Sequence, residues 1–85
     1  MANFNNLVFV SHPMVPGGIM AKYRFDNGKV ISVVAGEGLY SNCKSGLREA
    51  VDSPDDVSSF EVMFDNEVEG YCSRERINEI FKNNQ

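Results

Sequence analysis

Residues 19–35 read IMAKYRFDNGKVISVVA, two apolar and β-branched segments on either side of the dipeptide Asn27-Gly28. Asn-Gly is favoured in two-residue hairpin turns, because both residues tolerate the positive φ that such turns require. We therefore predict an antiparallel hairpin in which Phe25 pairs with Val30. This register places six side chains on one face, which we expect to face the core: Ile19, Ala21, Tyr23, Phe25, Val30 and Val34.

Further elements are predicted on both sides of this hairpin. Residues 7–10 (LVFV) are typical of a strand, and residues 59–65 alternate apolar and polar side chains as a half-buried strand does. Ser73 is a suitable N-cap for a helix that continues to about Lys82. In this helix, residues at positions i, i+3 and i+4 form an apolar stripe: Ile77, Ile80 and Phe81. We also predict a short helical turn at residues 47–51.

These elements predict an α+β fold: a small antiparallel sheet, with the hairpin at Asn27-Gly28 plus further strands, and a C-terminal α-helix packed on one face. The chain has 85 residues, which predicts a single domain spanning residues 1–85. Its 42% hydrophobic and 24% charged residues are those of a globular protein rather than a disordered tail. No apolar run approaches the length of a membrane span, and residues 1–6 do not read as a signal peptide.

A chain of this size has little room for a cleft and its supporting residues, so we expect a protein that is not an enzyme and uses no cofactor. Cys43 and Cys72 lie far apart and lack the C-x-x-C spacing of zinc and redox sites, so we predict reduced thiols, no metal and a cytoplasmic location. Catalysis around the single histidine, His12, with Ser11 or Ser41 is a weaker hypothesis. The S-x-x-K spacing of Ser41 and Lys44 lacks its companion motifs.

Charge is distributed unevenly along the chain. Residues 1–48 contain five Lys or Arg and two Asp or Glu, whereas residues 49–72 contain eight Asp or Glu and no Lys or Arg. Such an acidic segment suits contact with a basic partner protein, although it also keeps a small protein soluble. It does not suit direct binding to nucleic acid. The predicted partner-binding residues are Asp52, Asp55, Asp56, Glu61, Asp65, Glu67 and Tyr71.

The glycine-containing loop after residue 35 supports a second hypothesis. Lys44 and Arg48 could bind phosphate and Tyr40 could stack on a base, so the predicted ligand-binding residues of this alternative are Tyr40, Ser41, Lys44 and Arg48. The simpler interpretation is a connecting loop in which the glycines serve the turns.

The chain also resembles short uncharacterised accessory proteins encoded by tailed bacteriophages. The resemblance is carried by FDNG (25–28), ISVVAG (31–36), Gly38, YS (40–41), FEVM (60–63), Val68, GY (70–71) and INEI (77–80). It implies a phage protein that inhibits a host protein or an antiviral defence system in the host cytoplasm, and it brings no catalytic residues with it. The alternative is an oligomer that sequesters a small anionic cyclic nucleotide. A homo-oligomer formed through sheet edges fits both hypotheses.

Overall fold

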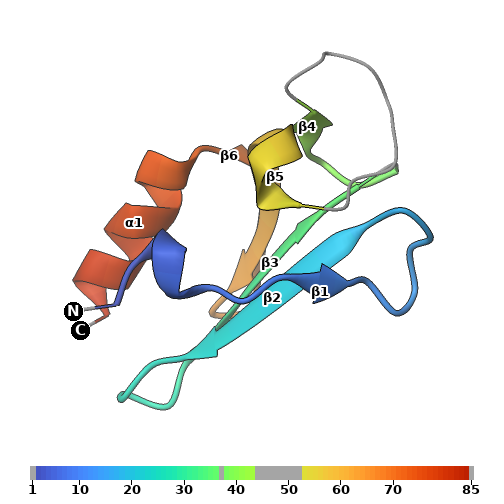
Figure 1. Ribbon diagram of the computed structural model, residues 1–85. Coiled ribbons are helices and arrows are strands. Elements are labelled where there is room, and N and C mark those ends of the chain that lie inside the picture. Colours follow the sequence, from blue (N-terminus) through green and yellow to red (C-terminus); the bar gives the residue numbers. More distant parts are fainter. Residues whose placement is uncertain (1, 37, 44–52, 85) are drawn as a thin grey trace.

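The fold is α+β, with an antiparallel six-stranded sheet and one C-terminal α-helix (Figure 1). The computed structural model describes residues 2–36, 38–43 and 53–84. The elements are the 3-10 helix η1 (Phe4–Asn6), β1 (Val10–Ser11), β2 (Ile19–Arg24), β3 (Val30–Ala35), β4 (Asn42–Cys43), the 3-10 helix η2 (Pro54–Asp56), β5 (Val57–Phe64), β6 (Glu67–Cys72) and α1 (Arg74–Asn83). The helical turn predicted at residues 47–51 lies outside the described residues.

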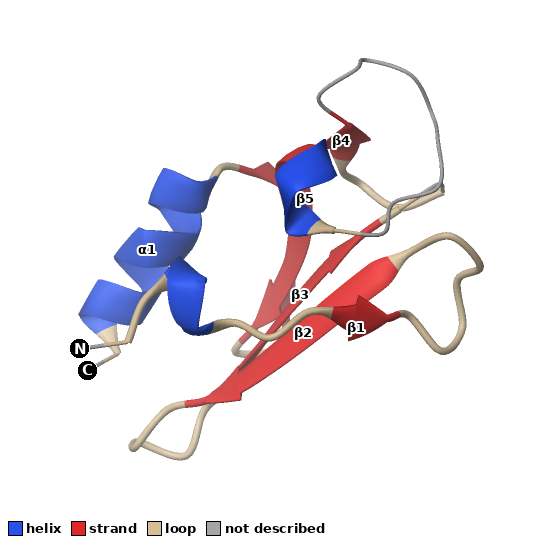
Figure 2. Cartoon of the chain, viewed as in Figure 1, coloured by secondary structure: helices blue, strands red, loops and turns tan. Residues whose placement is uncertain are grey.

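The strand order is β1-β2-β3-β5-β4, and β6 also pairs with β5. Figure 2 shows η1 beside α1, with the strands of the sheet next to them. The backbone N–H of Phe4 in η1 donates to Asn78 Oδ1 of α1 at 2.8 Å. We call the face of the sheet that packs on these helices the helix-side face, and the opposite face the open face.

The predicted β2–β3 hairpin is present, but its register is shifted by one residue. Arg24 pairs with Val30, and the backbone N–H of Phe25 donates to the carbonyl of Lys29 at 2.8 Å. The connecting loop therefore has three residues, 26–28, and its last residue, Gly28, has a φ of +88°. This is the hairpin loop in which a left-handed glycine follows a turn, an alternative that Asn-Gly also favours.

The register shift exchanges the faces of β3, since successive strand residues point to opposite sides. The prediction that Val30 and Val34 belong to the core is wrong: Val30 is 45% exposed, and both residues lie on the open face. Their places in the core are taken by three residues that are fully buried: Ile31, Val33 and Ala35. Ile19 and Ala21 of β2, and Phe25 directly after it, are buried as expected, and Tyr23 is partly buried against the core.

The two-residue turn with positive φ occurs in the other hairpin. Phe64 pairs with Glu67, and the two residues between them, Asp65 and Asn66, have φ values of +54° and +65°. Asn and Asp are the residues other than glycine that adopt this conformation most readily. The sequence pattern therefore identified the right kind of turn but placed it in the wrong hairpin.

The structure confirms the predicted C-terminal helix. Ser73 is the N-cap of α1, its hydroxyl accepting from the Arg76 N–H at 3.1 Å, and the predicted stripe of Ile77, Ile80 and Phe81 is buried. Lys82 and Glu75 lie in the last and first turns, where their charges oppose the helix dipole. The helix thus closes the core over the helix-side face.

The predicted strand at residues 7–10 is largely wrong, because only Val10 of this run belongs to β1. Leu7 is buried outside the sheet, and the Phe9 ring stacks on Phe60 of β5 with centroids 5.7 Å apart. Phe4 also contacts Phe60, at 5.2 Å. This segment fills the space between sheet and helix, which stabilises the fold more than extending an edge strand.

Candidate functional site

Strand β6 has the reverse of the side-chain pattern expected for a strand packed against a helix. Its glutamates, Glu67 and Glu69, lie on the helix-side face, since they pair with Phe64 and Val62. Val68 pairs with Met63 and lies on the open face. Residues that violate the local pattern without a benefit to stability are candidates for function. We therefore take the two sides of β6 as the candidate site.

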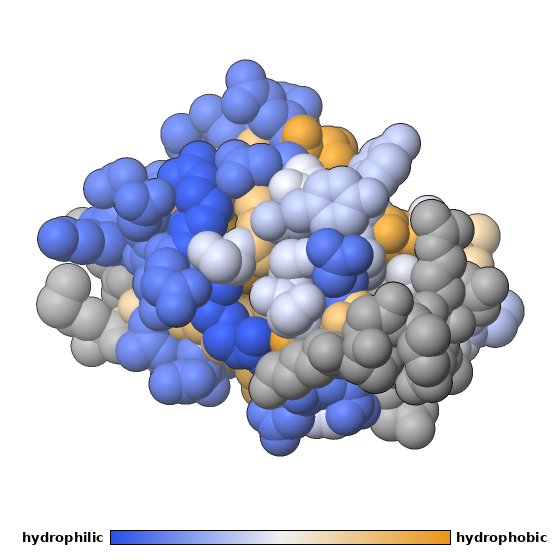
Figure 3. Space-filling model, turned by 90° about the horizontal axis from the view of Figure 1, so that it is seen from above, coloured by the Kyte–Doolittle hydropathy of each residue, from blue (hydrophilic) through white to orange (hydrophobic). Residues whose placement is uncertain are grey.

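The open face carries both apolar and polar side chains, and α1 and η1 pack on the other side of the sheet. Its polar residues are Lys22, Arg24, Ser32 and Glu61. The apolar residues come from five strands: Val10, Met20, Val30, Val34, Met63 and Val68. Met63 and Val68 are 54% and 57% exposed. Exposed apolar groups gathered on one face mark interaction surfaces more often than isolated ones do. By contrast, the end of the molecule seen in Figure 3 is mainly hydrophilic where the structure describes it, with apolar atoms in small separate patches.

Two tyrosines lie beside this apolar surface. The rings of Tyr40 and Tyr71 are 6.1 Å apart, and both residues are largely exposed. Their backbones are held by two hydrogen bonds, from the Tyr71 N–H to the Tyr40 carbonyl at 2.9 Å and from the Tyr40 N–H to Glu61 Oε1 at 3.3 Å. A side chain at Gly70 would place its Cβ 2.8 Å from the Tyr40 Cβ, so this close approach requires glycine. Tyr71 itself has a φ of +55°, an uncommon conformation for an aromatic residue.

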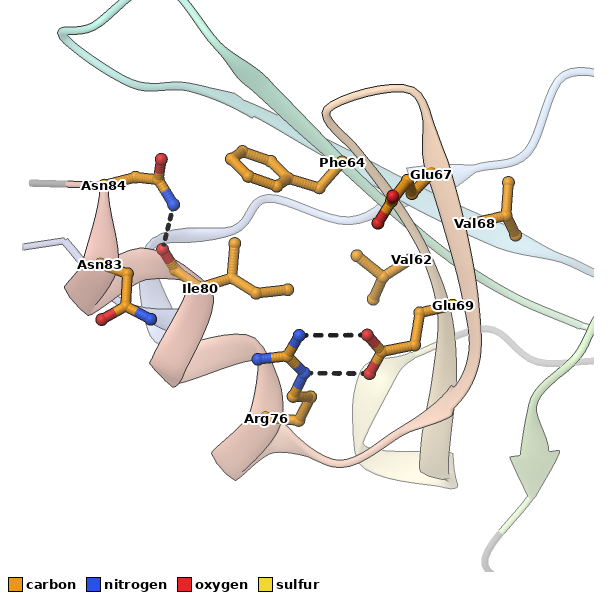
Figure 4. Close-up of a pocket in the computed structure, with 9 residues that line it drawn as sticks. All are labelled: Val62, Phe64, Glu67, Val68, Glu69, Arg76, Ile80, Asn83 and Asn84. Atoms are coloured by element: carbon orange, nitrogen blue, oxygen red, sulfur yellow. Dashed lines mark hydrogen bonds and ion pairs between the residues drawn. The ribbon is translucent and has the colours of Figure 1, made fainter.

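On the helix side of β6, the glutamates leave a groove between the β5–β6 hairpin and α1, which we call the β6–α1 groove (Figure 4). Its volume is about 270 Å³. Its lining residues are Val62, Phe64, Glu67, Val68, Glu69, Arg76, Ile80, Asn83 and Asn84. Arg76 bridges one end of the groove, donating from Nε and Nη2 to the two carboxylate oxygens of Glu69 at 3.0 and 3.1 Å.

This bridge shifts the protonation equilibria of its members. Hydrogen bonds from Arg76, and then from the Cys72 thiol, lower the pKa of Glu69 below its ordinary value. Burial, and then the hydrogen bond of its thiol to Glu69 at 3.1 Å, raise the pKa of Cys72 to about 12. A thiol with such a pKa stays protonated at neutral pH and is a poor nucleophile, so Cys72 serves packing rather than chemistry.

The predicted partner-binding acids do not form one cluster. Asp55 and Asp56 lie in η2, Glu61 lies on the open face, and Glu67 lines the groove. Asp65 lies in the β5–β6 turn, where its Oδ2 is 3.4 Å from Lys29 Nζ. Asp52 lies outside the described residues. The structure thus brings together Glu61 and Tyr71, through their shared contact with Tyr40, and separates the others.

The residues of the nucleotide hypothesis are only partly described. Tyr40 forms the pair with Tyr71, and the Ser41 hydroxyl accepts from the Gly36 N–H at 3.1 Å and donates to the Gly36 carbonyl at 3.3 Å. The Ser41 hydroxyl therefore helps to form the turn after β3. Lys44 and Arg48 lie outside the described residues, so a phosphate site at this loop stays a prediction.

The other residues considered for chemistry have local structural roles. His12 Nδ1 accepts from the Met14 N–H at 3.0 Å, which orders the loop before β2. Cys43 is half-buried and packs against the core. Within residues 2–36, 38–43 and 53–84, no three His, Cys, Asp or Glu side chains are arranged to hold a metal ion.

The alternation at residues 59–65 placed Met63 on the outward face of its strand, which the structure confirms. Sequence reasoning identified neither Val68 as a surface residue nor the groove. The sequence E-V-E at residues 67–69 does alternate, but alternation alone does not say which face is buried. In the part of the chain that the structure describes, no helix is both long enough and apolar enough to cross a membrane. Comparison with known protein families, curated proteins and solved structures found no match.

Proposed function

We propose that this protein is a non-enzymatic binding domain that docks onto a partner protein through the open face of its sheet, centred on the β5–β6 hairpin. The observation that supports this proposal most directly is the exposed Met63–Val68 pair beside the Tyr40–Tyr71 pair. Tyr and Met are enriched at protein interfaces. Tyr supplies a large contact area at a low cost in conformational entropy, and Met adapts its flexible side chain to the partner surface. A surface that served only to keep the protein in solution would not favour exposed apolar and aromatic residues such as these.

The geometry of the tyrosine pair supports a preformed contact surface. The Tyr40 N–H donates to the Glu61 carboxylate and the Tyr71 N–H donates to the Tyr40 carbonyl, while the absence of a side chain at Gly70 lets Tyr40 lie close against β6. Aromatic anchors that are rigid before binding lose little freedom in the complex. We expect the two tyrosines to contribute more binding energy than the surrounding residues.

The charges around this surface support a partner with basic groups. The segment from η2 to the end of β6 contains six Asp or Glu and no Lys or Arg. Of these acids, strand pairing places Glu61 on the open face, next to the tyrosines. Lys22 and Arg24 also lie on the open face, on β2, two strands away from β5. A partner whose basic residues face β5 and β6 would associate faster, and more so at low ionic strength.

The nature of the partner is inferred from the sequence alone. The resemblance to tailed-bacteriophage proteins favours a host protein, and inhibition of a host enzyme or defence system is the role that we propose on that basis. The docking surface and this role are independent, because the surface fits a partner of any origin that offers apolar and basic groups.

The test compares capture of partners by matched surface variants. Val68→Glu places a charge within the proposed surface, whereas Met14→Glu makes a similar change at a residue that is 82% exposed in the loop before β2. We expect a protein retained by the wild type and by Met14→Glu, at low salt, to be lost with Val68→Glu and with Tyr71→Ala. Equal retention by all four proteins, or retention by none, contradicts docking through the open face.

A further inference from the structure

The β6–α1 groove is a recess with an apolar floor and polar walls, in which the carboxylate of Glu67 has no ion-pair partner among the described residues. Val62, Phe64 and Ile80 form its floor. Figure 4 shows the Glu67 carboxylate on the hairpin side and Asn83 and Asn84 on the helix side, while Val68 points away from the groove. The groove exists because glutamates occupy the β6 positions that face α1, where apolar side chains would have filled the space.

The two glutamates of the groove differ in their surroundings. Glu69 is neutralised by Arg76, which also donates from Nη1 to Glu79 Oε1 at 3.2 Å. Among the described residues, no Lys, Arg or His lies within ion-pair distance of Glu67, and Arg76 is the only basic residue of the groove lining. One arginine therefore faces three carboxylates in and next to the groove, which leaves the groove negative around Glu67.

The end of α1 adds to this negative potential. The helix ends at Asn83, and Asn83 and Asn84 both line the groove. The last carbonyl groups of a helix point outward and carry the negative end of its dipole. The Asn84 side chain donates to the Ile80 carbonyl at 2.7 Å and its backbone N–H to Phe81, which satisfies two of these carbonyls. Lys82 lies in the last turn but does not line the groove.

We propose that this groove binds the cationic side chain of a lysine or arginine of the partner protein, an inference that rests on the proposed function above. The ammonium or guanidinium group lies between Glu67 and the end of α1, and its aliphatic stem covers Ile80 and Val62. The Phe64 ring already has Lys29 Nζ over it, 5.7 Å from its centroid, so we assign the cation to Glu67 rather than to this ring. An apolar ligand would desolvate Glu67 without compensation, and an anion would be repelled. A cationic group on an aliphatic stem therefore matches both the apolar floor of the groove and the carboxylate of Glu67.

The test uses the isolated protein and three small probes: the Nα-acetyl amides of arginine, lysine and norleucine. Norleucine has the stem of lysine without the charge. Methyl NMR spectra of Ile80 and Val62 report on the groove, and the methyls of Val10, on the open face of β1, serve as an internal control. We expect the two charged probes to shift the methyl resonances of Ile80 and Val62, norleucine to shift them much less, and those of Val10 to stay unchanged.

Glu67→Gln is the matched variant, since it keeps the shape of the side chain and removes its charge. We expect it to weaken binding of the arginine and lysine probes about fivefold, the effect of an ion pair worth about 1 kcal/mol, and to leave norleucine unaffected. Absence of shifts at Ile80, equal shifts with norleucine, or binding that Glu67→Gln leaves unchanged overturns the proposal.

This experiment and the capture experiment can fail separately. A partner that is lost with Val68→Glu but bound equally by wild type and Glu67→Gln keeps the open face as the docking surface and removes the groove from the interface. Conversely, probe binding in the groove together with equal capture by all open-face variants removes the open face and retains the cation site.

Discussion

The β2–β3 and β5–β6 hairpins belong to the same sheet, but they distribute their side chains differently. In β2–β3, the helix-side positions are occupied by Ile19, Ala21, Ile31, Val33 and Ala35, all of which are buried. In β6, the corresponding positions hold Glu67 and Glu69, and an apolar residue faces outward. The first hairpin follows the requirements of a core, so it is explained by stability. The second does not, and for this reason we assign the binding surfaces to it.

The largest expected effect concerns the core side of the first hairpin. Ile31→Ala removes a fully buried side chain and should lower the free energy of unfolding by about 2–5 kcal/mol. Val30→Ala, the adjacent change on the open face, should cost less than about 0.5 kcal/mol. Urea unfolding followed by circular dichroism measures both. Comparable losses would mean that the register of β3 is wrong by one residue.

The turns of the two hairpins should respond oppositely to substitution. Gly28→Ala puts a Cβ on a residue with a φ of +88°, where no atom lies within 4 Å of the new group, so the expected cost of about 1 kcal/mol is purely conformational. Asn66→Gly relieves a positive φ and should raise stability by a smaller amount. Thermal unfolding measures the two changes. A neutral Gly28→Ala would contradict the three-residue loop.

The reversed pattern of β6 predicts a gain in stability from a change that abolishes function. Glu67→Leu should fill part of the groove against Val62, Phe64 and Ile80 and raise the free energy of unfolding by about 1 kcal/mol. The same variant should no longer bind the arginine probe. Glu67→Gln separates loss of charge from gain of apolar contact, because it should not raise stability. Destabilisation by Glu67→Leu would mean that the glutamate is needed by the fold.

The smallest expected effect is the pH dependence of the Glu69–Arg76 bridge. The pKa of Glu69 is lowered in the folded protein. The bridge therefore contributes fully to the free energy of unfolding above the unfolded pKa, ordinarily 4.5, and this contribution is lost as the pH falls through the lowered pKa. Because both side chains of the bridge are more than 40% exposed, we expect the free energy of unfolding of the wild type to exceed that of Glu69→Gln by only about 0.5 kcal/mol at neutral pH. The urea midpoints of the wild type and Glu69→Gln should converge as the pH is lowered. A difference between the two midpoints that stays constant with pH would contradict the bridge.

The parts of the fold that depend on local pattern could be predicted from the sequence. Ser73 followed by Ile77, Ile80 and Phe81 identified α1, and the alternation around Phe60 and Val62 identified β5 and its buried face. The register of β3 could not be predicted in this way. Asn-Gly fits both a two-residue and a three-residue loop. Residues 30–35 are apolar on both faces, so either register buries apolar side chains and the sequence does not distinguish the two.

The candidate site was less accessible to sequence reasoning, because it depends on non-local packing. The acids of β5 and β6 were recognised as a charged segment, but Glu61 and Glu67 lie on opposite faces of the sheet. That separation depends on strand pairing and on the turn at Asp65-Asn66. The groove further requires the end of α1 to lie opposite Glu67, which follows only from the assembled structure.

The hydrogen bond from Phe4 to Asn78 joins positions 74 residues apart, and it has a consequence for biosynthesis. Phe4 and Phe9 pack on Phe60, so the segment before β1 completes these contacts only after residues 60–78 have been translated. Nascent chains that end before Asn78 lack this closure, so we expect protease to cleave them around residues 4–9 more readily than chains that include α1.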